Sequence, residues 1–135
     1  MDERDEPALG KPLPRADEAV IDPRKLTDYT LDPTNSRGRH KAEVFRVALR
    51  IERADWRYLR GAILETLPLN PVTSVRRAER PAGVTTYGVV LPVTGLNGQT
   101  RLVITTWKLV AGLPHLTGAR VAKKRAQPPP DGTTL

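Results

Sequence analysis

Residues 83–110 read GVTTYGVVLPVTGLNGQTRLVITTWKLV, and this stretch decides the fold. Two runs rich in β-branched residues, 83–93 and 100–110, flank a loop that contains Asn97-Gly98. Asn-Gly is the strongest short signal for a β-hairpin because both residues tolerate a positive φ angle. The stretch therefore predicts two antiparallel strands joined by a tight loop.

Working outward, two further runs with a period of two predict strands at 72–79 and 115–122. Before these strands the apolar period is 3.6, which predicts one helix from about His40 and a second helix that ends at Pro68. The apolar residues of each predicted helix share a face: Val44, Phe45, Ala48 and Leu49 in the first, and Trp56, Leu59, Ile63, Leu64 and Leu67 in the second. The sequence thus predicts an α+β fold in which two N-terminal helices pack on one face of a four-stranded antiparallel sheet. The other face of the sheet would be open to a ligand.

The ends of the chain differ in composition from its middle. Residues 1–23 hold charges, prolines and almost no apolar periodicity, which predicts a disordered acidic leader. Residues 124–135 contain Pro128-Pro129-Pro130, which predicts a disordered Pro-rich tail. We therefore expect one α+β domain over 24–123. We expect three side chains of its first segment, residues 25–33, to pack into the core: Leu26, Tyr29 and Leu31.

Charge is distributed unevenly along the chain. Residues 1–22 hold seven acidic and three basic side chains, a net charge of −4, whereas residues 23–135 hold 8 acidic and 19 basic ones, a net charge of +11. A domain of that sign attracts phosphate backbones, so nucleic acid is the first partner to consider. An arginine-rich surface without a nucleic-acid partner is the alternative. The acidic leader would either fold back on the basic body or serve only as a solubilising tail.

Several classes of chemistry lack their residues. The chain has no cysteine, which excludes disulfides, zinc–thiolate sites and a thiol nucleophile. It also lacks a Gly-rich phosphate loop, a G-x-S-x-G elbow and a His-Glu-x-x-His pair. We therefore expect no metal and no cofactor. No apolar run approaches the roughly 18 residues of a membrane span, and no signal-peptide pattern follows Met1, so we expect a cytoplasmic protein.

Three places offer candidate site residues. The first is the run Arg37-Gly38-Arg39-His40-Lys41, which puts three cations and an imidazole at the start of the first predicted helix. Exposed backbone N–H groups there favour a phosphate, and solvated surface charge is the alternative. Alternation along the third predicted strand puts Arg101, Thr105 and Trp107 on one face, where the ring would stack on a base, unless Trp107 belongs to the core.

The third place is His115, at the start of the last predicted strand, where it would act as a general acid or base. The alternative is that His115 is a surface histidine in a turn and has no catalytic role. A metal-free ribonuclease needs only such groups: a base, an acid and cations that stabilise the phosphorane.

The run from Lys25 to Val121 resembles a small uncharacterised bacterial domain family whose members open with K-L-T-x-Y-x-L-(D/N)-P, here Lys25 to Pro33. The pattern continues as Asn35-x-x-Gly38-x-x-Lys41-Ala42-x-x-Phe45, Tyr87-Gly88, Thr105-x-Trp107 and Gly112-x-Pro114-x-Leu116-Thr117. Such domains occur beside a small partner gene, in polymorphic toxins and in phage head-associated proteins, so the resemblance implies a toxin or effector domain. The order of elements also looks like the barnase–EndoU–colicin–RelE ribonuclease fold. Carried over residue by residue, the pattern singles out Lys41, Thr105, Trp107 and Thr117.

The leading hypothesis is a toxin-type, metal-independent ribonuclease that acts on RNA and is neutralised by a small acidic antitoxin or immunity protein. Its catalytic residues would be His40, Lys41, His115 and Thr117, and its substrate-binding residues Arg39, Arg101, Thr105 and Trp107. It would act in the cytoplasm, be delivered into a target cell or be packaged in a phage particle. The alternative is a non-catalytic module that binds nucleic acid or protein, including a phage-associated accessory.

Overall fold

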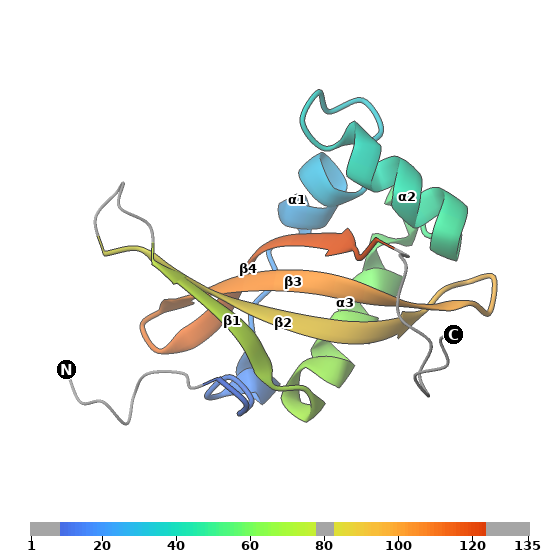
Figure 1. The fold of residues 1–135 in the computed structure, drawn as a ribbon. Helices are drawn as coiled ribbons and strands as arrows, with labels where there is room; N and C mark the ends of the chain where they lie inside the picture. Colours follow the sequence, from blue (N-terminus) through green and yellow to red (C-terminus); the bar gives the residue numbers. More distant parts are fainter. Residues whose placement is uncertain (1–8, 78–82, 124–135) are drawn as a thin grey trace, which may run out of the picture.

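The computed structural model describes residues 9–77 and 83–123 (Figure 1). One antiparallel sheet contains four strands in chain order: β1 (Val72–Arg77), β2 (Thr85–Thr94), β3 (Thr100–Val110) and β4 (Leu113–Val121). The two longer helices precede it as α2 (Arg39–Leu49) and α3 (Trp56–Thr66). The α+β class and the four-stranded antiparallel sheet are confirmed. Within the described ranges, no helix is long and apolar enough to cross a lipid bilayer.

The helix prediction holds only in part, because the chain also forms several short helical turns. They are η2 (Ala16–Glu18), α1 (Pro23–Lys25), η3 (Leu26–Thr30), η4 (Arg53–Asp55) and η5 (Leu67–Leu69). Of these, η3 is a π-helical turn, in which the amide N–H of Leu31 donates to the carbonyl of Leu26, 2.8 Å away. This turn buries Leu26 and Leu31 and leaves Tyr29 exposed, so the expectation that Tyr29 packs into the core is wrong.

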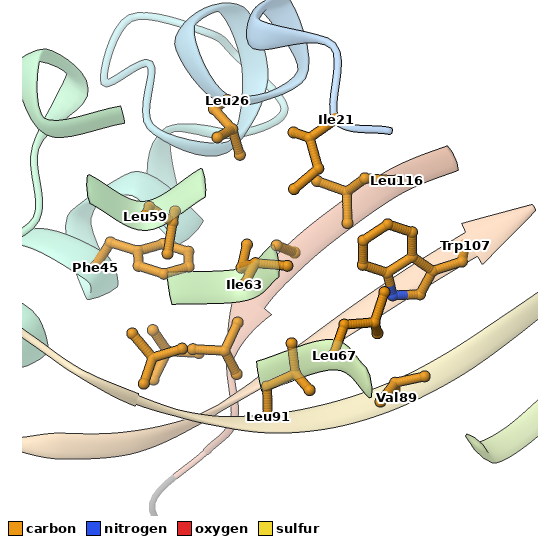
Figure 2. Packing of buried hydrophobic residues seen from close by; sticks show 14 of the residues in the cluster. Ile21, Leu26, Phe45, Leu59, Ile63, Leu67, Val89, Leu91, Trp107 and Leu116 are labelled. Atoms are coloured by element: carbon orange, nitrogen blue, oxygen red, sulfur yellow. The ribbon is translucent and has the colours of Figure 1, made fainter. Parts of the chain in front are cut away.

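The core lies between the helices and one face of the sheet (Figure 2). Phe45 of α2 and Leu59 and Ile63 of α3 pack over the sheet side chains, in agreement with the apolar faces predicted from the period of 3.6. The sheet contributes alternate residues to this core: Val72, Tyr87, Val89, Leu91, Val93, Val103, Thr105, Trp107, Leu116, Ala119 and Val121. On the opposite face, Pro92, Leu102 and Arg120 are exposed to solvent.

The predicted hairpin forms between β2 and β3, with Gly98 at a φ of 82°. Its loop also closes the end of α2. The amide N–H of Leu96 donates to the carbonyl of Leu49 (2.9 Å), and the Asn97 side-chain amide donates to the carbonyl of Ala48 (3.1 Å). The loop thus satisfies two carbonyl groups that a helix end leaves without an intrahelical partner.

Residues 9–22, here called the strap, run from one edge of the sheet to the other. Gly10 donates its N–H to the carbonyl of Val72 in β1 (2.9 Å), and at the far edge Val20 donates its N–H to the carbonyl of Pro114 in β4 (2.8 Å). Three strap side chains lie in the core: Leu13, Ala16 and Ile21. The prediction of a disordered leader is therefore wrong for residues 9–23, because both edge strands and the core supply partners for this segment. Residues 1–8 and the predicted tail at 124–135 lie outside the described residues, as do the last two residues of the strand predicted at 72–79.

Trp107 is held in the core by a relay of two hydrogen bonds. Its indole N–H donates to the Thr105 hydroxyl (2.8 Å), and that hydroxyl donates to the carbonyl of Val89 (2.7 Å). Both side chains are 0% exposed. Thr105→Val keeps the shape but leaves the buried indole N–H without an acceptor, so we expect the free energy of unfolding to fall by about 1–3 kcal/mol. Urea denaturation measures this loss.

The control for this variant is Thr100→Val, which changes an exposed strand threonine and should alter stability by less than about 0.5 kcal/mol. Equal stability of the two variants would contradict the relay.

Candidate anion-binding site

A pocket of about 390 Å³ opens beside the edge strand β4, where α1, η3 and the start of α2 meet the sheet. We call it the β4 pocket and define it by its lining residues: Lys25, Tyr29, Thr30, Asn35, Arg37, Gly38, Lys41, Thr117, Gly118 and Ala119. Figure 1 shows the same arrangement, with α1 and α2 on the β4 side of the sheet. The volume falls within the roughly 300–1,000 Å³ of small-ligand sites in proteins.

The β4 side of the pocket is made by a β-bulge. The register shifts between Thr106 and Trp107, so Thr117 has no residue opposite it in β3. Its hydroxyl lies 2.8 Å from the hydroxyl of Thr106, which fixes the Thr117 side chain. Bulges of this kind redirect a side chain at a sheet edge. The strap pairs with β4 at His115, and the N–H of Leu116, one residue before the bulge, donates to the carbonyl of Val20 (3.0 Å). The pocket therefore begins where that pairing ends.

Asn35 organises the opposite side of the pocket. Its side-chain amide donates to the carbonyl of Asp28 in η3 (3.0 Å), while its side-chain oxygen accepts the N–H groups of Arg37 and Gly38 (both 2.9 Å). Its backbone carbonyl accepts the N–H of Arg39 at 2.8 Å, where α2 begins. One side chain therefore ties η3 to the start of α2, and its role in the site is structural.

The lining of the β4 pocket is positively charged. Lys25, Arg37 and Lys41 contribute three cations, and no lining residue carries a carboxylate. Within the described part of the chain, none of the three forms an ion pair, in contrast to the four arginines that do: Arg15, Arg24, Arg46 and Arg53. Like charges in one lining repel one another, which favours binding of an anion. The carboxylates of Asp22 and Asp28 line an adjoining pocket that shares Lys25 and Tyr29 with this one.

The start of α2 strengthens this preference. Gly38 is the N-cap residue and provides no side-chain cap, and no acidic residue lies in the first turn. The positive end of the helix dipole therefore lies at the pocket, and the first turn of α2 supplies no negative partner for it. The Asp22 carboxylate, at the start of α1, already accepts hydrogen bonds from the side chain and the amide of Arg24. These hydrogen bonds lower the pKa of Asp22 to about 2.

The structure brings together only part of the predicted site. Lys41 and Thr117, which lie far apart in the sequence, both line the β4 pocket. Arg39 and His40 are exposed in the first turn of α2 but do not line it. His115 lies on β4 opposite Lys108, outside the lining, and the Arg101 guanidinium donates to the carbonyl of Ala122 (3.0 Å). The pocket thus contains neither histidine of the predicted mechanism.

Thr105 and Trp107 do not belong to a binding surface. Because both are fully buried under the helices, the prediction that Trp107 stacks on a base is wrong, and the alternative, a core tryptophan, is confirmed (Figure 2). Alternation separated the two faces of β3 correctly but did not show which face the helices cover.

Lys25 and Tyr29 line the pocket, although neither was among the predicted site residues. The signal that could have found them is the family pattern, since six of its positions line this one pocket: Lys25, Tyr29, Asn35, Gly38, Lys41 and Thr117. Within the described ranges, no group of three or more His, Cys, Asp or Glu side chains comes together as a metal ligand set.

A family model described as Domain of unknown function (DUF6883) matches residues 12–121, so the match takes in most of the strap, both helices and the whole sheet. No curated protein and no solved structure matches the chain.

Proposed function

We propose that this domain, which belongs to the DUF6883 family of domains of unknown function, binds RNA by holding a phosphate group in the β4 pocket. One observation carries the proposal. Lys25, Arg37 and Lys41 line a single pocket without a carboxylate, and the start of α2 faces the same space. Such a combination of cations and a helix N-terminus suits a phosphate group.

The charge around the pocket supports a polymer rather than a lone phosphate. Residues 83–123 contain no carboxylate and four cations: Arg101, Lys108, Arg120 and Lys123. Lys108 and Arg120 are exposed on the face of the sheet that the helices leave open. The open face of β3 and β4 therefore adds positive charge to that of the pocket, and the summed field attracts a polyanion more strongly than a single phosphate. The Thr117 hydroxyl already shares one hydrogen bond with Thr106 and keeps a lone pair that can accept the O–H of a ribose 2′-hydroxyl.

A second candidate, a toxin-type and metal-independent ribonuclease, is supported by the position of Lys41 and Thr117. Both predicted catalytic residues line the β4 pocket together with Lys25 and Arg37, cations that would stabilise a phosphorane. Since His40 and His115 do not line the pocket, proton transfer in this mechanism would fall to Lys25, Lys41 or the Tyr29 hydroxyl. A small acidic antitoxin or immunity protein would then neutralise the enzyme by covering the pocket.

Lys41→Ala tests phosphate binding in the full-length chain. We expect it to weaken binding of a labelled RNA hairpin with a single-stranded tail about equally for all RNA sequences. The slope of log K against log salt should become shallower by about 0.7 to 1, because one phosphate contact is lost. Fluorescence anisotropy over a salt series measures both quantities.

The matched control is Arg60→Ala, which removes one exposed charge from α3, outside the pocket lining. An equal change in slope for both variants would contradict a site at the β4 pocket.

The same RNA, recovered after incubation with the protein in EDTA, distinguishes the ribonuclease from the binding module. RNA fragments produced by the unaltered protein but not by the Lys41→Ala variant would establish the ribonuclease. Intact RNA would support the non-catalytic binding module instead.

A further inference from the structure

The β4 pocket contains an aromatic ring that its anion-binding role does not use. Tyr29 lines the pocket and is 55% exposed, although Leu26 and Leu31 of the same turn are buried. A ring that is half exposed at a positively charged pocket can contact a ligand, with the Lys25 ammonium over the ring as its neighbour.

The backbone that carries Tyr29 is held in place from several sides. The carbonyl of Tyr29 accepts the N–H of Asp32 (3.3 Å), and the carbonyl of the preceding residue, Asp28, accepts the Asn35 side chain (3.0 Å). The carboxylate of Asp28 also forms an ion pair with Arg53 at 3.5 Å. A ring on such a fixed turn loses little conformational entropy when it binds, as a stacking platform requires.

The ring and the cations of the pocket lie close together. The Lys25 ammonium lies 5.8 Å from the centroid of the Tyr29 ring, and Arg37 and Lys41 line the same pocket. Within one nucleotide, the flat apolar base and the charged phosphate are also neighbours. The pocket therefore presents complementary groups to both parts of a single nucleotide.

We infer that Tyr29 stacks on an unpaired base whose phosphate is held by Lys41 and Arg37, so that the RNA bound at the β4 pocket is single-stranded. This inference rests on the proposed RNA binding and names its substrate class. A base inside a duplex is already stacked on both faces, so its face cannot reach a side chain unless the duplex opens. A duplex contacts the same cations only through its backbone.

Binding of a single-stranded octanucleotide and of a duplex of equal length tests the inference in the full-length chain. We expect Tyr29→Leu to weaken binding of the single strand roughly 5- to 150-fold, the range that corresponds to about 1–3 kcal/mol per stacked base. Binding of the duplex should change less than about twofold. The salt slope should stay the same for both ligands, because no charge is removed.

Tyr29→Phe is the matched control, since it keeps the ring and removes the hydroxyl. We expect it to bind the single strand within about threefold of the unaltered protein. An equal loss for Tyr29→Phe and Tyr29→Leu would overturn stacking, because the hydroxyl would then be the group in contact. So would unchanged binding by Tyr29→Leu, or equal losses on both ligands. If neither RNA binds the unaltered protein, or if Lys41→Ala has no effect, the proposed function itself fails.

Discussion

A chain that lacks residues 1–22 is expected to be unfolded at room temperature, because the strap belongs to the folded domain. Removal of the strap takes Leu13, Ala16 and Ile21 out of the core and exposes the edges of β1 and β4. Loss of a single buried leucine or isoleucine side chain costs about 2–5 kcal/mol, and the whole stability of a small domain is about 5–15 kcal/mol. Circular dichroism and urea denaturation of the truncated chain measure the effect.

Two further variants make this test graded. Ile21→Ala, at a position that is 2% exposed, should fold but lose about 2–5 kcal/mol of stability. Deletion of residues 1–8 keeps the whole strap and serves as the control for chain length, with an expected denaturation midpoint close to that of the full-length chain. A chain starting at residue 23 that unfolds at the same urea concentration as the full-length protein would show that the strap contributes nothing.

The strap could not be predicted from local patterns. Its buried residues are spaced irregularly among prolines and charges, and no period of two or 3.6 connects Leu13, Ala16 and Ile21. Their burial depends on two sheet edges that form elsewhere in the chain. By contrast, β3 was predicted at its observed bounds, because alternation and the Asn97-Gly98 loop are encoded within a few residues.

The predictions for Trp107 and Tyr29 were wrong for two separate physical reasons. For Trp107, a period of two separates the faces of a strand, but both faces of β3 carry apolar residues, so the pattern alone does not identify the core. For Tyr29, the local turn is π-helical and brings Leu26 and Leu31, five residues apart, to the same side. Tyr29 then points away from the core and into the pocket lining.

Gly38→Ala is expected to disturb the fold and the β4 pocket together. A Cβ atom on Gly38 would lie 2.5 Å from the backbone oxygen of Tyr29, a distance that real Cβ atoms essentially never show. Neither side gives way easily, because Asn35 ties both segments together. We expect the free energy of unfolding to fall by about 1–3 kcal/mol, the usual cost of overpacking. Thermal and urea denaturation measure this loss.

Gly61→Ala is the matched control, and its effect should have the opposite sign. Gly61 lies inside α3, and a Cβ atom added there would have no neighbouring atom within 4 Å, so an alanine meets only open space. Because glycine costs a helix roughly 0.5–1 kcal/mol relative to alanine, Gly61→Ala should stabilise the domain by about that amount.

If RNA binds at the β4 pocket, Gly38→Ala should also weaken RNA binding, since a shift of η3 against α2 separates Tyr29 from Lys41. Gly61→Ala should bind RNA normally. Equal stability of the two variants would mean that η3 and α2 move apart freely, and the β4 pocket would then have no fixed shape.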